Sequence, residues 1–239
     1  VVATPQLLNG NNLDYIVYDY LAEITMSIMA RARAKDPSKG YAIDFVSSVM
    51  KLNLRQIADQ KVKILSNAGG VNPQACAEAI RSLIKELNLD LKVAVVLGDD
   101  LLKDKDKFLD SGVQEMYSDE RFPELDKIAS INAYLGAFPI AQALNDGADI
   151  VITGRSVDSA VTLAACIYTY GWKEDDYDKL ASGSLAGHII ECGTQSTGGN
   201  YTDWELSTKN LHMIGYPIVD VSENGEFICT KSKNTSGLV

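Results

Sequence analysis

The sequence has few histidines and no closely spaced cysteines. Among its 239 residues, only His188 and His212 are histidine. The cysteines lie far apart and form no C-x-x-C pair: Cys76, Cys166, Cys192 and Cys229. Zinc sites need clustered cysteine and histidine ligands, so the sequence predicts no metal. Scattered thiols of this kind are typical of reduced cytosolic cysteines, and we therefore expect a cytoplasmic protein.

Positive charge is also scarce, with 22 lysines and arginines against 32 aspartates and glutamates, a net charge of −10. An acidic chain repels phosphate backbones, so we expect no nucleic-acid partner. No apolar run reaches the length of a membrane helix and no signal-peptide pattern opens the sequence, so we expect no membrane partner. The P-loop motif and the G-x-G-x-x-G dinucleotide fingerprint are also missing, which argues against a nicotinamide oxidoreductase.

What the sequence does contain is a regular alternation of strand and helix patterns. The predicted strands are 14–18, 62–66, 92–97 and 149–153. Helical spacing of apolar residues follows each strand, as with Leu21, Ile24, Ile28 and Ala32 after the first. The predicted fold class is α/β: a mainly parallel, Rossmann-like sheet with helices on both faces. A C-terminal antiparallel hairpin is expected around Asn224-Gly225.

The pattern predicts a single domain over residues 1–239. We expect a parallel βα unit at 1–171, followed at 172–239 by a glycine-rich loop and the hairpin as an extension. The charged, mixed segment 101–130 predicts a surface excursion. Neither end of the sequence has the pattern of a natural terminus, so we expect a fragment of a longer chain.

Polar residues and glycines follow all four predicted strands. Ligands bind at the carboxyl edge of an open parallel sheet, so we expect a binding rim there. The candidate catalytic residues of this rim are Glu23, Asp99, Asp100 and Asp158. The candidate substrate-binding residues are Asn67, Gly69, Gly70, Asn72, Gly154 and Arg155.

Each feature of the rim has two interpretations. The glycines of loop 67–72 either admit a ligand to a helix N-terminus or only turn the chain, with Asn72 as a cap. Arg155 either clamps a carboxylate or phosphate, or pairs with Asp158 as a structural ion pair. The acids at 99–100 are either a metal site or acid–base pair, or a helix cap and a solvated neighbour.

A dense polar stretch lies further along the chain. His188 is a candidate catalytic residue because it shares a helical turn with Glu191 and Cys192, although a packed histidine and a buried thiol are the alternative. The glycine-rich stretch 197–203 predicts a loop that folds over the rim or contacts another subunit. Its candidate substrate-binding residues are Gly198, Gly199, Asn200 and Asp203.

Four long segments resemble the N-terminal domain of the acyclic terpene utilisation family, AtuA-type. They are "LDYIVYDYLAEITMSIMARARAKDPSKGYAIDFV", "NAGGVNPQACAEAI", "GADIVITGRSVDSAVTL" and "LAGHIIECGTQSTGGNYTDWE". The resemblance implies a role in breakdown of acyclic terpenes or branched acids, through acyl-CoA thioesters. It implies no catalytic residues. It also implies a glycine-rich strand and loop before this sequence and often a smaller second domain after it.

We therefore expect an enzyme that acts on an acyl-CoA thioester or carboxylic acid, as a lyase, a hydratase or another acyl-CoA-processing enzyme. The cofactor is left open, with CoA considered as part of the substrate. A small anionic or acyl-CoA ligand and a homo-oligomer are the expected partners. The alternatives are a non-catalytic ligand-binding subunit of a catabolic complex, and a metal-assisted hydrolase that uses Asp99, Asp100 and His188.

Overall fold

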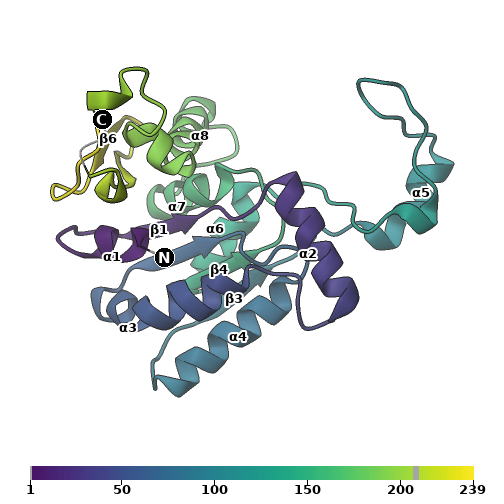
Figure 1. The fold of residues 1–239 in the computed structure, drawn as a ribbon, viewed down its shortest axis with the longest axis horizontal. Coiled ribbons are helices and arrows are strands. Elements are labelled where there is room, and N and C mark those ends of the chain that lie inside the picture. The colour runs from purple at the N-terminus through teal and green to yellow at the C-terminus, as the bar shows by residue number, and fades with distance from the viewer. Residues whose placement is uncertain (1, 207–209) are drawn as a thin grey trace.

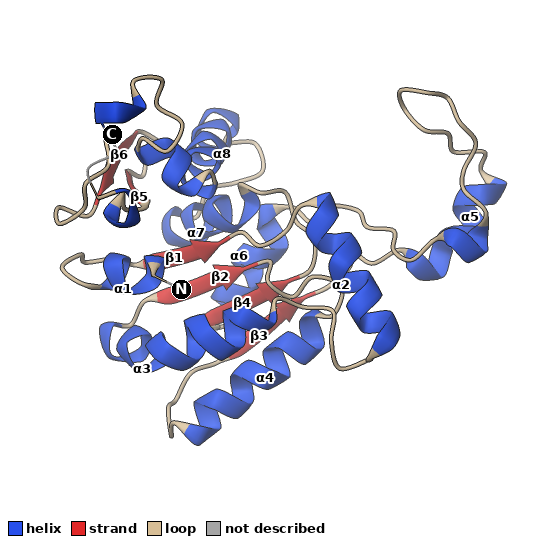
Figure 2. Ribbon diagram, viewed as in Figure 1, coloured by secondary structure: helices blue, strands red, loops and turns tan. Residues whose placement is uncertain are grey.

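The computed structural model, which describes residues 2–206 and 210–239, contains a parallel sheet of four strands. The strands are β1 (Tyr15–Tyr18), β2 (Lys63–Ser66), β3 (Val93–Val96) and β4 (Ile150–Thr153). Their order across the sheet is β1-β2-β4-β3, and each neighbouring pair is parallel (Figure 2). The predicted strand segments and their parallel pairing are confirmed.

Helices cover both faces of this sheet, as predicted. Alternate residues of a strand point to opposite faces, and the strands here are apolar on both, so each face needs a layer of helices to bury it. Ile64 and Ile150 pack against one helical layer, and Leu65 and Val151 pack against the other. The first layer contains α3 (Lys51–Gln60), the π-helix η1 (Phe45–Met50) that leads into it, and α4 (Pro73–Glu86). The second contains α6 (Ala137–Asn145) and α7 (Ala160–Tyr170).

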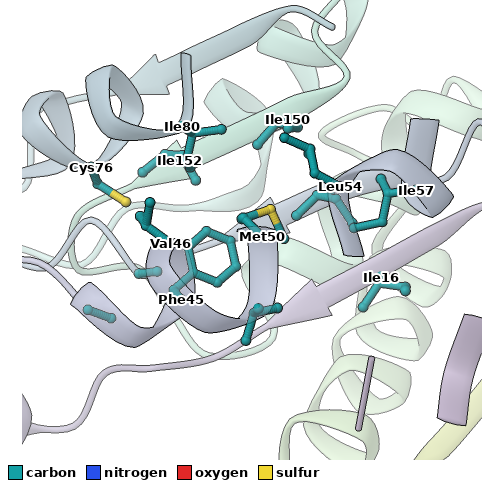
Figure 3. Close-up of a cluster of buried hydrophobic side chains, with 14 of the residues drawn as sticks. Ile16, Phe45, Val46, Met50, Leu54, Ile57, Cys76, Ile80, Ile150 and Ile152 are labelled. Atoms are coloured by element: carbon teal, nitrogen blue, oxygen red, sulfur yellow. The ribbon is translucent and has the colours of Figure 1, made fainter. Parts of the chain in front are cut away.

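Large apolar side chains fill the first layer. Phe45, Met50 and Leu54 point from η1 and α3 toward Ile150 and Ile152 of β4 (Figure 3). All five are fully buried. This core fixes the strands, and therefore also the loops that leave their carboxyl ends.

The remaining elements surround this core. They are α1 (Ala3–Leu8), α2 (Glu23–Lys35), α5 (Lys105–Asp110), α8 (Tyr177–Glu191) and the short helices η2 (Leu102–Asp104), η3 (Leu125–Lys127), η4 (Gly193–Thr197), η5 (Trp204–Leu206) and η6 (Leu211–Met213). The antiparallel hairpin of β5 (Pro217–Val221) and β6 (Phe227–Lys231) confirms the predicted C-terminal hairpin. Gly225 turns it with a φ of +94°, which glycine adopts without steric strain.

Residues 101–131 form an arm that projects from the body, beyond the carboxyl edge of the sheet (Figure 1). Its base is tied by a hydrogen bond of 2.8 Å from the Leu101 N–H to the Ile131 carbonyl. None of residues 100–136 is buried, so the predicted surface excursion is confirmed. Among the helices in the described part of the chain, none has the length and apolarity needed to cross a membrane.

Candidate functional site

The segments that leave the four strands meet at one edge of the sheet. Asn67, directly after β2, donates through Nδ2 to the Asp19 carboxylate after β1. Arg155, after β4, donates its backbone N–H to Oδ2 of Asp99, which follows β3, at 2.8 Å. Hydrogen bonds therefore join the end of β1 to the end of β2, and the end of β3 to the end of β4.

The Arg155 side chain lies beneath this edge and is almost fully buried, with 5% of its surface exposed. Its Nη1 donates to the carbonyls of Leu21 and Ser156 at 3.1 and 3.2 Å, and to Oδ1 of Asp158 at 2.7 Å. Its Nη2 lies 3.5 Å from Oε1 of Glu23. These contacts favour the structural alternative, in which Arg155 holds two carboxylates in place. Direct recognition of an anion by Arg155 stays a prediction.

Tyr134 completes the surroundings of Arg155. Its ring centroid lies 4.1 Å from the guanidinium carbon, which is cation–π geometry. The Tyr134 hydroxyl donates 2.6 Å to Oε1 of Glu23. That hydrogen bond, with the nearby Arg155 charge, lowers the pKa of Glu23. Glu23 is therefore an exposed carboxylate held in its ionised form, and Tyr134 is a site residue that the sequence did not reveal.

Asp99 fastens the ends of β3 and β4 together. Its Oδ2 accepts from the Arg155 backbone at 2.8 Å and from Asn132 Nδ2 at 2.9 Å. A Cβ on Gly154 would lie 2.3 Å from that oxygen, so glycine is needed for the carboxylate to fit. Burial raises the pKa of Asp99, which is 3% exposed. These contacts fit a structural role better than the predicted catalytic one.

Its neighbour Asp100 is exposed at the base of the arm. Oδ1 of Asp100 accepts from the Leu102 backbone at 3.0 Å, and Oδ2 lies 3.4 Å from Arg33 Nη1. Among the described residues, the candidate metal-ligating groups do not combine Asp99, Asp100 and His188. The metal-assisted hydrolase predicted from those three residues therefore finds no support in their placement.

Loop 67–72 is packed rather than open. Gly69 and Gly70 are buried, and a Cβ on Gly69 would lie 2.4 Å from the Thr153 carbonyl oxygen. A Cβ on Gly70 would lie 2.3 Å from the Met29 sulfur. Asn72 caps α4 by accepting from the Ala75 N–H at 3.4 Å. The loop geometry therefore favours turning and capping, and ligand binding there stays a prediction.

Asp19 is a half-buried carboxyl group at this edge. Its Oδ1 accepts from the Leu21 N–H at 3.1 Å and from Asn67. Burial raises the pKa of Asp19, an effect that the nearby Asp158 charge reinforces. The carboxylate oxygens of Asp19, Asp158 and Glu191 lie within 4.8 Å of one another. These three residues form a group, here called the carboxylate triad, that could also hold a divalent cation.

Glu191 reaches the triad because α8 packs closely on α7. A Cβ on Gly187 would lie 2.9 Å from the Ser159 carbonyl oxygen, and one on Gly183 would lie 2.8 Å from a Leu163 methyl carbon. Glycines four residues apart share one helix face, so α8 approaches without a side chain between the helices. This G-x-x-x-G spacing is the signal from which the approach of Glu191 could have been foreseen.

His188 and Cys192 both contact Glu191, and one ligand atom from each of the three residues lies within 4.8 Å of the other two. Nδ1 of His188 lies 3.2 Å from Oε1 of Glu191, and the Cys192 thiol donates to the same oxygen at 3.3 Å. Burial, with the adjacent Glu191 carboxylate, raises the pKa of Cys192. The thiol is therefore not activated as a nucleophile, whereas His188, with 70% of its side chain exposed, is accessible.

The glycine-rich stretch 197–203 lies against the C-terminal segment. Thr197 donates to the Gly215 carbonyl at 2.7 Å, and its own carbonyl accepts from the Leu238 N–H at 2.8 Å. Gly199 and Asn200 bond back to Thr194 and Gln195. Closure of this stretch over the rim, and substrate binding by Gly198, Gly199, Asn200 and Asp203, stay predictions.

A cavity of about 690 Å³ lies away from the carboxyl edge, between β1 and β5. The Tyr170 hydroxyl donates to the Val221 carbonyl at one end of this space. Asn11 Nδ2 donates 2.8 Å to Ser232 Oγ beside Lys231 and Lys233, which also line it. None of the sequence-predicted site residues lines this cavity.

A family model described as "Acyclic terpene utilisation family protein AtuA" matches residues 1–239. The chain belongs to the AtuA family. This confirms the family resemblance and associates the chain with acyclic terpene utilisation. Searches of curated proteins and of solved structures found no match. The AtuA family match assigns no reaction to the carboxylate triad.

Proposed function

We propose that this AtuA-family chain is an enzyme that transfers a proton to or from the acyl part of a CoA thioester or carboxylic acid. Asp19 is the proton carrier in this proposal. The observation that supports it most directly is the opposite perturbation of two carboxyl groups that both lie near Arg155. Burial raises the pKa of Asp19, whereas the Tyr134 hydroxyl lowers the pKa of Glu23. Carboxyl groups whose pKa values are pushed apart can serve as acid and base.

The surrounding contacts give each group a role. Asn67 and the Leu21 N–H hold one oxygen of Asp19, which fixes the direction of its carboxyl group. Arg155 and Tyr134 both contact the Glu23 carboxylate and hold it in place. The accessible rim is acidic, so the neutral acyl carbon next to the carbonyl is the group expected at Asp19. Any phosphate groups of CoA would extend outward, away from these carboxylates.

Proton exchange tests this function without knowledge of the physiological product. The protein is incubated in ²H₂O with a panel of branched and unsaturated acyl-CoA thioesters, and with the matching free acids. Deuterium uptake or addition of water is measured by mass spectrometry. Loss of a general acid–base group lowers rates by about 10²–10⁴-fold, so Asp19→Asn should abolish the signal.

The matched control is Asp178→Asn, because Asp178 is exposed in the first turn of α8. Equal rates for Asp19→Asn and this control would rule out Asp19 as the proton carrier. Binding of an acyl-CoA without exchange or hydration in any of the proteins would instead favour the ligand-binding subunit, the non-catalytic alternative.

The carboxylate triad supports a second candidate function, metal-assisted hydrolysis. Three carboxylate oxygens within 4.8 Å of one another could bind Mg²⁺ or Mn²⁺, and the cation could activate a water molecule. Titration with Mn²⁺, followed by electron paramagnetic resonance, tests this candidate directly. Glu191→Gln should weaken Mn²⁺ binding, whereas Glu174→Gln at an exposed site should not. Activity that survives a chelator would exclude the metal-assisted route.

A further inference from the structure

Two apolar surfaces are exposed, one on the arm and one on α2. The first is the tip of the arm, residues 113–120, where Met116 is 79% exposed and Tyr117 is 87% exposed. The second is the outer face of α2, where Ile24 is 74% exposed and Ile28 is 58% exposed. An apolar stripe on a helix normally faces a core, so the exposure of these isoleucines marks an uncovered surface.

The tip is an ordered turn. The Glu115 N–H donates to the Glu120 carbonyl at 2.9 Å, and the Asp119 N–H donates to the Glu115 carbonyl at 3.0 Å. The Glu115 carboxylate accepts the Tyr117 N–H at 2.8 Å. These bonds hold Met116 and Tyr117 at the end of the arm. Exposed large side chains on a preorganised turn lose little conformational entropy on binding, which suits them as interface anchors.

The part of the arm between its base and its tip is held by contacts within the arm. Phe108 and Phe122 stack with their ring centroids 6.2 Å apart, which links α5 to the returning chain. Lys105 Nζ donates 2.9 Å to the Leu125 carbonyl. At the base, the Ala133 N–H donates to the Asp99 carbonyl at 2.9 Å. The arm therefore has a defined shape and a fixed connection to the body.

The two surfaces are complementary in charge as well as in apolar character. Exposed carboxylates flank the tip at Glu115, Asp119 and Glu120. On α2, the stripe of Ile24 and Ile28 continues with exposed Arg31 and Lys35, at the i+7 and i+11 positions. A basic end on this helix is notable in a chain of net charge −10.

The geometry points to a second copy of this chain as the partner. We propose that the arm tip of each copy docks on the α2 face of the other, which gives a dimer with a two-fold axis. This dimer is here called the clasp. Both the donor and the acceptor surface are present in every chain, which is what an isologous interface requires. In Figure 1 the arm leaves the body on the side where α2 lies, so a partner on that side meets both surfaces.

The clasp also reaches the carboxyl edge of the sheet. Ile24 directly follows Glu23, whose carboxylate contacts Tyr134 at the foot of the arm. A docked arm therefore borders the rim of the partner copy and shields it from solvent. This inference stands on exposure, shape and charge, and it does not depend on the proposed proton transfer.

Light scattering coupled to size exclusion, together with native mass spectrometry over a dilution series, tests the clasp on the 239-residue protein. The wild-type protein should be a dimer. Met116→Ser combined with Tyr117→Ser should weaken dimerisation by at least about 100-fold, since buried aromatic anchors dominate interface affinity. Ile24→Ser combined with Ile28→Ser should weaken dimerisation to a similar extent, because these substitutions remove the apolar surface on α2. A monomeric wild-type protein would overturn the proposal.

Exposed apolar residues elsewhere give matched controls. Leu52→Ser, on α3, and Ile228→Ser, on β6, remove side chains that are 71% and 70% exposed, and both proteins should remain dimers. A dimer that survives the substitutions at both the tip and α2 would also overturn the proposal. So would a dimer that dissociates equally with the control substitutions.

A charge exchange tests the pairing of the two surfaces. Asp119→Lys with Glu120→Lys should weaken the dimer, because the tip would then face Arg31 and Lys35 with like charge. Adding Arg31→Glu and Lys35→Glu in the same chain should restore dimerisation, since every copy then carries both reversed surfaces. Failure of this rescue, in proteins with unchanged circular dichroism, would argue against docking of the tip on α2.

Discussion

The Arg155 guanidinium lies against the Tyr134 ring, with its central carbon 4.1 Å from the ring centroid, while the Tyr134 hydroxyl donates to Glu23. The same guanidinium contacts Glu23 and Asp158. One buried cation therefore positions an aromatic ring and two carboxylates at the carboxyl edge of the sheet.

Arg155→Lys should destabilise the protein, because an ammonium group cannot replace the planar guanidinium that bonds Leu21, Ser156 and Asp158 together. We expect a loss of about 1–3 kcal/mol in the free energy of unfolding, as for other charged hydrogen bonds. Such a loss lowers the melting temperature by roughly 2–4 °C per kcal/mol for a chain of this size. Arg81→Lys, at an exposed position of α4, serves as the control. Unchanged stability with weaker acyl-CoA binding would instead support direct recognition of an anion by Arg155.

Asp19→Asn should stabilise the protein at neutral pH and have little effect in acid. Burial raises the pKa of Asp19 in the folded state. Its protonated form therefore favours folding below the unfolded pKa of about 3.9, and this contribution is lost as pH rises through the folded pKa. Asparagine keeps an oxygen for Asn67 and Leu21 but carries no charge. Urea unfolding at pH 3 and pH 7 measures the difference, and a variant less stable than wild type at pH 7 would contradict this account.

Tyr134→Phe should raise the pKa of Glu23 toward its ordinary value. The lost hydroxyl is the main cause of the lowered pKa, whereas the ring that packs on Arg155 remains. NMR titration of side-chain carboxyl carbons measures this shift. If Glu23 belongs to the catalytic pair, the acidic limb of the pH–rate profile should move upward with it. An unchanged Glu23 pKa would mean that the Tyr134 hydroxyl does not keep this carboxylate ionised.

Gly154→Ala should separate the ends of β3 and β4. The added Cβ would lie 2.3 Å from Oδ2 of Asp99, which accepts two hydrogen bonds there. Overpacking of this kind costs about 1–3 kcal/mol, measurable by chemical denaturation. Gly136→Ala is the control, because no atom lies within 4 Å of its added Cβ and its φ is −88°. Equal stability of the two variants would show that Asp99 moves aside without loss.

The sequence determined the architecture of this protein. Apolar strand segments and helically spaced apolar residues are local properties of the chain, and they predicted the four parallel strands and the helices on both faces, while Asn224-Gly225 predicted the hairpin. They also placed the polar residues at one edge, because parallel strands align their carboxyl ends. Long segments of the sequence also predicted the family, which the family match confirms.

Only the tertiary structure decided what each residue at that edge does. Burial and pairing depend on residues far apart in the chain, so the sequence could not tell that Arg155 lies under Tyr134 or that Gly154 faces Asp99. Glu191 joins Asp19 and Asp158 because two glycines of α8 let it approach α7. In the same way, the periodicity of α2 predicted a helix, but only the packing around it left Ile24 and Ile28 uncovered. A pattern of apolar residues specifies a face, and the neighbouring elements determine what covers it.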